Sequence, residues 1–228
     1  MTDMLKKVSL PILLFCFSVV VFAQERETDL GAAFSIQLQK SLGRKVEISL
    51  EEELRLLNNN ANFDRLASTV GADYSIIDKK LKVGVYYCYL YMYNSDFFYE
   101  NRHRYYLSLN YKEHFGKYTV SWRGRLQGTS RDECRGEYKI NPKYVLRNRL
   151  QVEYSIFGSP WKPYISAETT NSLNDPLGNE IYKLRFQGGT SWRMDRRSYL
   201  EFFLRLDEYI AGNDPRVFSI GVGYKRNL

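Results

Sequence analysis

Charged residues recur at every second position along several segments of the chain, and arginine and glutamate share the same phase. Arginine binds a carboxylate through two parallel N–H donors, and a charge withdrawn from water must be paired to be tolerable. The chemistry that this pattern favours is therefore ion pairing or anion binding. The residues that we expect to form one charged network are Glu47, Glu51, Glu53, Arg55, Arg123, Arg125, Arg147, Arg149, Glu153, Glu168, Arg185, Glu201 and Arg205.

Catalysis has weaker support in the sequence. A hydrolase of the serine–histidine type would need a serine and a histidine within hydrogen-bond reach. Ser108 lies five residues from His103, too far along a strand that rises about 3.3 Å per residue. No Gly-x-Ser-x-Gly motif is present. We therefore predict no enzymatic activity, and a lipid-modifying enzyme is kept as the alternative.

Cofactor and nucleic-acid sites are not predicted. Cys88, Cys134, His103 and His114 lack the ligand spacing of a zinc site, and no phosphate-binding loop or dinucleotide fingerprint occurs. The pI near 9.2 is not a nucleic-acid footprint, because basic residues are interleaved with acids. We expect Cys88 and Cys134 to be free thiols, with a disulfide as the alternative in an oxidising compartment.

The elements that must position the charged network are β-strands. Within residues 118–127, Val120, Trp122 and Leu126 share one face, while Arg123 and Arg125 fall on the other. Alternation at period two is typical of a strand between two different environments. Eleven such segments are expected, at residues 29–39, 45–57, 65–75, 80–92, 102–112, 117–127, 143–154, 161–170, 181–191, 198–208 and 216–225.

The length of these segments predicts that the charged face points into a barrel and the apolar face meets lipid. A bilayer requires roughly 9–11 tilted residues per strand, and aromatic residues gather near the segment ends as in interfacial girdles. Shorter and longer connections alternate along the chain, as on the two rims of outer-membrane barrels. We predict an all-β fold, a transmembrane antiparallel β-barrel of about 10–12 strands. A secreted soluble β-barrel or sandwich that binds a ligand is the alternative.

Two details do not fit this scheme. Bacterial single-chain barrels normally have an even number of strands, so either the first segment is not a wall strand or one strand has been missed or split. In addition, Glu52 falls on the apolar phase, which would suit a bulge or the membrane boundary.

Residues 1–23 are predicted to be a secretory signal peptide. Lys6 and Lys7 precede an apolar run, and Val21 and Ala23 suit a cleavage point before Gln24. An uncleaved membrane anchor and a lipoprotein attached at Cys16 are the alternatives. Residues 24–228 contain no linker or composition break and are expected to form one outer-membrane barrel domain in a Gram-negative bacterium.

Two roles for the charged lumen stay open. The residues could form a paired network that plugs the barrel, which would make the protein structural. Alternatively, surplus arginine could attract an anion, which would make it a narrow passive conduit or small-ligand binder. An adhesin-like surface binder is a third possibility. The expected partners are outer-membrane lipid and a small anionic solute, with no nucleic acid and no cofactor.

Several short motifs along the chain point to a known family. They are Glu51-Glu52-Glu53-Leu54-Arg55, Asn58-Asn59-Asn60, Arg123-Gly124-Arg125-Leu126-Gln127, Leu146-Arg147-Asn148-Arg149-Leu150, Pro163-Tyr164-Ile165-Ser166-Ala167-Glu168 and Tyr182-Lys183-Leu184-Arg185, in this order. In these motifs the chain resembles the uncharacterised outer-membrane barrels grouped as domain of unknown function 2490. The resemblance implies a barrel without an assigned activity or catalytic residues. The chain departs from the family pattern at Lys183 and at its C-terminal Leu228.

Overall fold

The computed structural model describes residues 28–57, 62–93, 99–131, 140–176, 180–210 and 215–228. These residues form eleven strands. Their bounds are β1 Thr28–Leu42, β2 Val46–Leu57, β3 Asn62–Ile77, β4 Leu81–Tyr93, β5 Tyr99–Phe115, β6 Tyr118–Arg131, β7 Lys143–Tyr154, β8 Trp161–Ser172, β9 Ile181–Arg193, β10 Ser198–Tyr209 and β11 Arg216–Asn227. No helix in this part of the chain is long and apolar enough to cross a membrane. The predicted signal peptide and Cys134 lie outside the described residues.

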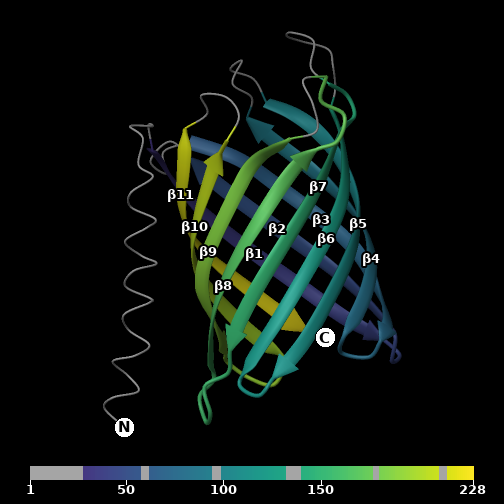
Figure 1. Cartoon of the computed structure of the whole chain (residues 1–228), viewed down its shortest axis with the longest axis vertical. Helices are drawn as coiled ribbons and strands as arrows, with labels where there is room; N and C mark the ends of the chain where they lie inside the picture. Colours follow the sequence, from purple (N-terminus) through teal and green to yellow (C-terminus); the bar gives the residue numbers. More distant parts are fainter. Residues whose placement is uncertain (1–27, 58–61, 94–98, 132–139, 177–179, 211–214) are drawn as a thin grey trace.

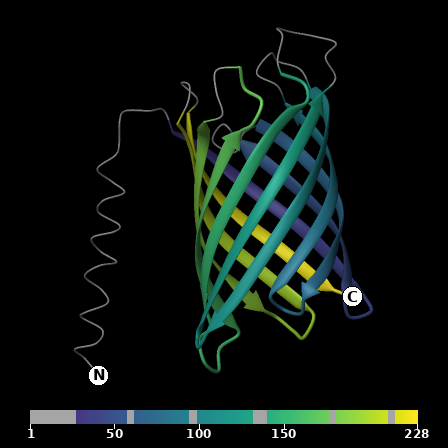
Figure 2. The ribbon, with the colours of Figure 1, turned by 45° about the vertical axis from the view of Figure 1, so that its right-hand side comes forward.

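The strands close into one barrel in which each strand pairs with its neighbours in sequence (Figures 1 and 2). The predicted all-β barrel of 10–12 strands is confirmed, and all eleven predicted segments are wall strands. The antiparallel expectation is wrong at one seam, because β1 and β11 pair in parallel from Thr28 opposite Arg216 to Gln39 opposite Asn227. The physical reason is parity: an odd number of up-and-down strands brings the first and last strands together in the same direction.

The two rims of the barrel differ in their connections. One rim, called here the loop rim, joins β2 to β3, β4 to β5, β6 to β7, β8 to β9 and β10 to β11. The opposite turn rim has mostly shorter connections. In the turn between β9 and β10, the Oδ1 of Asp195 accepts the backbone N–H groups of Arg197 at 2.6 Å and Ser198 at 2.7 Å. These hydrogen bonds, the Arg197 N–H first, lower the pKa of Asp195.

The outer surface of the wall is apolar. Leucine, isoleucine, valine and phenylalanine side chains are about half exposed along it, among them Leu107 on β5, Leu150 on β7 and Ile220 on β11. Trp161 and Trp192 stack at 5.4 Å between ring centroids close to the turn rim. An apolar exterior with aromatic rings near the rims is the inverted pattern of a transmembrane barrel. The prediction that the charged face points inward is therefore confirmed.

Glu52 is an exception on this apolar exterior. It pairs regularly with Ile36 on β1 and Ser68 on β3, and the Ser68 hydroxyl donates a hydrogen bond to its Oε2 at 2.7 Å. The irregularity between β2 and β3 occurs at Arg55 and Leu56. The explanation that Glu52 marks a bulge is therefore wrong, and Ser68 supplies its polar partner instead.

Aromatic rings fill part of the lumen where glycines leave room. Phe203 on β10 packs with Ala33 and Tyr164 in a buried cluster, and a Cβ added to Gly221 would lie 2.0 Å from the Phe203 ring. Gly189 on β9 is less tolerant of a side chain, because its added Cβ would lie 2.4 Å from the backbone oxygen of Phe202. A backbone atom within the sheet cannot move aside as a side chain can. The packing of Tyr164 on β8 and Phe203 on β10 thus depends on the absence of a side chain at Gly189.

Neighbouring glycines on β9 provide a matched test of this packing. Gly189→Ala is expected to lower the free energy of unfolding by about 1–3 kcal/mol, as overpacking of a well-filled interior does. Gly188→Ala should change it little, because nothing lies within 4 Å of the added Cβ. Urea unfolding of both variants in the same lipid vesicles measures the difference. Equal effects of the two substitutions would contradict the packing described here.

Candidate functional site

Four adjoining cavities follow one another along the lumen. A loop-side cavity of about 330 Å³ shares Arg104 and Arg147 in its lining with a central cavity of about 230 Å³. Two turn-side cavities of about 500 and 820 Å³ lie on the other side of the central cavity. The first shares Glu51 and Glu201 with it, and the second shares Arg123 and Arg149. Because neighbouring cavities share lining residues, they adjoin one another in a series along the lumen, called here the lumen route.

The structure places all thirteen residues of the predicted network on this route. Glu47 and Glu153 line the turn-side cavities, and the other eleven line the central cavity. They reach it because odd-numbered positions on β2, β6, β7, β9 and β10, and even-numbered positions on β8, point inward. Their partners, however, differ from a simple pairing of arginine with glutamate across the lumen.

Glu168 on β8 is the centre of the ion-pair network. Its side chain is only 3% exposed, and its Oε2 accepts a hydrogen bond from Arg123 on β6 at 2.8 Å. Its Oε1 accepts a hydrogen bond from the Nε–H of Arg147 on β7 at 3.0 Å, and the Nη1 of Arg185 on β9 lies 3.9 Å from the same oxygen. One carboxylate thus ties together four consecutive strands of the barrel wall.

A second buried carboxylate, Asp207 on β10, holds two cations of β9. Arg185 donates to it through two N–H groups at 2.5 and 2.8 Å, a bidentate pair, and the Nζ of Lys183 lies 2.9 Å from Oδ2. Glu53 instead pairs with Arg55 on its own strand at 2.6 Å. Two other predicted glutamates near the turn rim have lysine partners that the sequence analysis did not single out. These pairs are Glu47 with Lys82 and Glu153 with Lys162.

Arginine exceeds carboxylate in the central cavity. Eight arginines and four glutamates line it. None of the salt bridges between described residues involves four of these arginines. These four residues, called here the surplus arginines, are Arg104 on β5, Arg125 on β6, Arg149 on β7 and Arg205 on β10. Asp207 forms no salt bridge with them, because it already pairs with both Arg185 and Lys183.

The strand register places arginines directly opposite one another. Arg123 lies directly opposite Arg149, and Arg125 lies directly opposite Arg147, on the neighbouring strands β6 and β7. Like charges in such positions are destabilising. Glu168 forms salt bridges with Arg123 and Arg147 and also lies opposite Arg149 in the register between β7 and β8, so a single carboxylate faces several guanidinium groups. These four arginines are therefore held together at a cost that one glutamate does not remove.

The surplus arginines are fixed by neutral contacts. The guanidinium of Arg125 lies 4.0 Å from the centre of the Tyr106 ring, and that of Arg205 lies 4.6 Å from the Phe203 ring. Arg205 also donates to Gln187 at 3.2 Å, and Arg104 donates to Thr129 at 3.3 Å. The Nε of Arg125 is fully buried without a hydrogen-bond partner among the described residues. These contacts orient positive charge without neutralising it.

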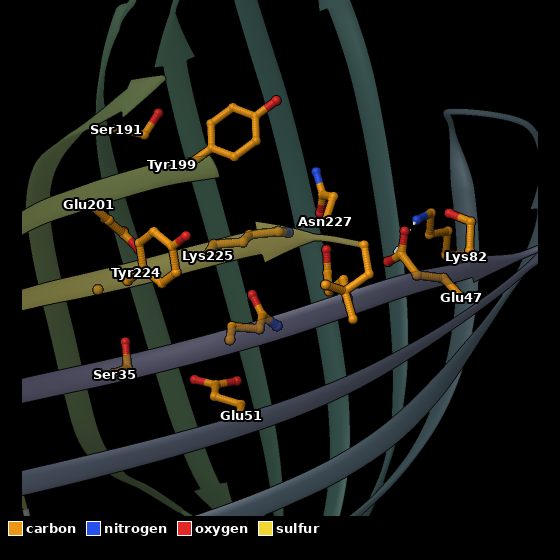
Figure 3. A pocket seen from close by; sticks show the side chains of 15 residues that line it. Ser35, Glu47, Glu51, Lys82, Ser191, Tyr199, Glu201, Tyr224, Lys225 and Asn227 are labelled. Carbon is orange, nitrogen blue, oxygen red and sulfur yellow. Dashed lines mark hydrogen bonds and ion pairs between the residues drawn. The ribbon is translucent and has the colours of Figure 1, made fainter. Parts of the chain in front are cut away.

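Charge changes along the barrel axis. Nine lysine and arginine side chains and a single glutamate line the loop-side cavity. In the smaller turn-side cavity, Glu47, Glu51 and Glu201 outnumber the lysines Lys82 and Lys225 (Figure 3). The surplus of positive charge therefore extends from the loop rim through the centre into the larger turn-side cavity, where eight lysines and arginines face four acidic residues, and it reverses only in the smaller turn-side cavity.

Comparison with known proteins places the chain among barrels of unestablished activity. The model of a protein family of unknown function, DUF2490, matches residues 31–209. The chain belongs to this family. Among solved structures it is similar to the β domain of the Bordetella autotransporter Brka, with 10% identity and a TM-score of 0.47 over 82% of this chain and 86% of that one. A search of curated proteins gives no match.

In this DUF2490 chain the two candidate catalytic residues do not come together. His103 points outward, where its Nδ1 lies 2.6 Å from the hydroxyl of Tyr87, whereas Ser108 is buried at 2% exposure and hydrogen-bonds with Asn110. They lie on opposite faces of β5. Cys88 is a buried free thiol in the central cavity lining. No cluster of His, Cys, Asp or Glu suited to a metal occurs among the described residues.

Sequence reasoning missed several residues of the site. Arg104 belongs to the central cavity but stands in an Arg-His-Arg run at the expected start of a strand, where it was not assigned to the network. Lys183 and Arg65 were missed because β3 begins earlier than expected and β9 has an irregularity near Ile181. If the alternation is followed to the true ends of the strands, it identifies Arg65 and Arg104 as residues of the inward-facing phase.

Two glutamates test the ion-pair network of this DUF2490 barrel. Glu168→Gln is expected to lower the free energy of unfolding by roughly 3–5 kcal/mol, because it leaves Arg123 and Arg147 without compensation. Glu153→Gln should cost about 0–1 kcal/mol, since Glu153 lies 3.6 Å from the half-exposed Lys162. Denaturant titration in lipid vesicles compares them. A Glu168→Gln variant as stable as Glu153→Gln would show that the lumen is too hydrated for the network to matter.

Proposed function

We propose that the protein is an outer-membrane barrel that acts as a narrow passive conduit for small anions. The observation that carries this proposal is the lining of the central cavity, where eight arginines face four glutamates. A cleft of one charge sign between walls of low dielectric constant focuses the field and concentrates counter-ions. Rings of arginine or lysine side chains serve this purpose in anion-conducting pores.

The arrangement of the cavities supports passage as well as binding. The loop-side cavity leads to the central cavity through a wall that includes Arg104 and Arg147, and the central cavity adjoins both turn-side cavities. A small hydrated ion would therefore meet positive charge from the loop rim to the centre. The smallest of the four cavities, about 230 Å³, is the one that the surplus arginines line. A permeating ion would therefore meet these arginines where the lumen leaves the least free volume.

The alternative of a plugged structural barrel explains fewer of these contacts. The ion pairs of Glu168 and Asp207 hold neighbouring strands together, as a structural network would. A network that serves only stability has no use for Arg125 and Arg149, however, because uncompensated charge in a partly buried site is costly. The surplus arginines are the feature that favours an anion-handling role over a plug.

The outer-membrane location is tested by fractionation. The apolar exterior and the predicted signal peptide support export followed by insertion into the outer membrane. The mature chain is expected to begin at Gln24, to sediment with outer membranes and to migrate faster on an unboiled gel than on a boiled one. Recovery of the folded protein from the soluble periplasm would contradict this location and favour a soluble β-protein.

The conduit is tested by current measurement in planar bilayers. Under a tenfold KCl gradient the wild-type reversal potential is expected to have the sign of chloride selectivity. Arg149→Gln should move that potential toward zero, because it removes from the central cavity one positive charge that has no salt bridge among the described residues. The matched control is Arg197→Gln in the exposed turn between β9 and β10, which should leave the potential unchanged.

The outcomes separate the two roles of the lumen. Absence of unitary currents in wild type, combined with large destabilisation on removal of Glu168, would support the structural plug and overturn the proposed conduit. Cation selectivity would also overturn it, because the surplus arginines would then not govern the permeating ion.

A further inference from the structure

We infer that the central cavity is a binding site for one compact oxyanion that carries two or more negative charges, and that the surplus arginines Arg104, Arg125, Arg149 and Arg205 hold it. The inference rests on the proposed function and deepens it, because it names the class of solute. It concerns a defined binding site rather than a general preference for anions.

The charge of the site sets the valence of its ligand. Four arginines of the central cavity have no salt bridge among the described residues. The cavity also contains Glu51 and Glu201, of which Glu201 accepts a hydrogen bond from Tyr164. A monovalent halide would neutralise only one of the surplus charges. A multivalent anion compensates several of them at once, which is what an enclosed group of like charges requires.

The shape of guanidinium sets the chemistry of its ligand. Arginine presents a planar fork of N–H donors that matches the oxygens of phosphate and carboxylate groups, and it binds them in bidentate fashion. The guanidinium groups of Arg125 and Arg205 lie over the rings of Tyr106 and Phe203, and these contacts hold both groups in the wall of the cavity. The buried Nε of Arg125 still lacks an acceptor in the described part of the chain. Oxygen atoms of a bound oxyanion would supply acceptors for these donors.

The spacing on β6 and β7 favours an anion with more than one oxygen edge. Arg125 faces Arg147, and Arg149 is two residues away on the same strand. Such diagonal neighbours are about 7–8 Å apart. A single ligand placed between Arg125 and Arg149 can accept hydrogen bonds from both and relieve their repulsion.

The volume of the cavity limits the size of the ligand. About 230 Å³ is below the roughly 300–1,000 Å³ of pockets that hold drug-sized organic molecules. Nucleotides and oligosaccharides are therefore too large for the central cavity, whereas inorganic phosphate, sulfate and pyrophosphate fit it. On the turn side Glu51 and Glu201 bound the cavity, so the anion is expected to rest between the surplus arginines, away from these two carboxylates.

Thermal unfolding with defined salts tests the site. The barrel folded in detergent is heated in buffers of constant ionic strength in which chloride is replaced stepwise by pyrophosphate or sulfate. Pyrophosphate is expected to raise the unfolding midpoint in a saturable manner, sulfate to a smaller extent, and chloride not at all beyond its ionic strength. The double variant Arg125→Gln, Arg149→Gln should weaken the apparent affinity for pyrophosphate at least tenfold.

A charge-matched control shows whether the effect belongs to the central cavity. Arg196→Gln, Arg197→Gln removes two positive charges from the exposed β9–β10 turn and should leave pyrophosphate binding unchanged. Arg205→Gln provides a second lumen variant, so the result does not depend on the folding of one protein. Equal stabilisation of all variants by pyrophosphate would place its binding elsewhere and overturn the inference.

Current block separates failure of this inference from failure of the conduit. Micromolar to millimolar pyrophosphate added on the loop side should block the chloride current of wild type and much less that of the double variant. If the current is chloride-selective, but pyrophosphate neither blocks it nor raises the unfolding midpoint of the barrel, the multivalent site is refuted and the conduit stands. Absence of anion selectivity, with pyrophosphate still bound in the central cavity, would refute the conduit alone.

Discussion

The charge inside the barrel must be compensated within an apolar wall, and the rest of the structure depends on this constraint. A wall that presents leucine, isoleucine and valine to lipid leaves the inward face as the place for polar residues, and in this chain that face is rich in arginine. Glu168 meets the constraint for Arg123 and Arg147, and Asp207 meets it for Arg185 and Lys183. The surplus arginines form no salt bridge with a described carboxylate, although Glu51 and Glu201 line the same cavity and Glu168 lies opposite Arg149, and they are the part of the lumen that is open to a solute.

The way the barrel closes determines where that solute can sit. Eleven strands form a narrow lumen, and the parallel seam between β1 and β11 completes it. Beside the seam, Phe203 and Tyr164 pack over small residues such as Ala33 and Gly221. These rings occupy one side of the central lumen. Arg104, Arg125 and Arg149 line the cavity from β5, β6 and β7, and Arg205 lies beside Phe203 on β10.

Much of the wall could be predicted from the sequence, because period-two alternation reports directly on two environments. The strand over residues 143–154 was predicted with the bounds that β7 has. Other strands extend further than predicted: β5 begins at Tyr99 rather than at residue 102, since aromatic and charged residues near the rim blur the alternation. The odd strand number was visible in the sequence, but the parallel seam that accommodates it follows only from closure of the sheet.

The partners of the charged residues could not be predicted in the same way. Alternation tells which residues point inward, whereas pairing depends on strand tilt and register across the lumen. The Glu53–Arg55 pair lies within a single strand, and Glu168 meets arginines of three strands. Arg104 escaped notice because the expected strand began only two residues before it. Its place in the central cavity depends on the register between β5 and β6, in which it lies opposite Thr129.

Anomalous diffraction from crystals of the barrel soaked in selenate tests the central claim most directly. Selenate is a compact divalent oxyanion with a strong anomalous signal. We predict a peak in the central cavity within hydrogen-bond distance of the Arg125 and Arg149 guanidinium groups. A central cavity that contains only water, with these two arginines forming salt bridges to Glu51 or Glu201, would contradict the claim that the lumen carries a surplus of positive charge.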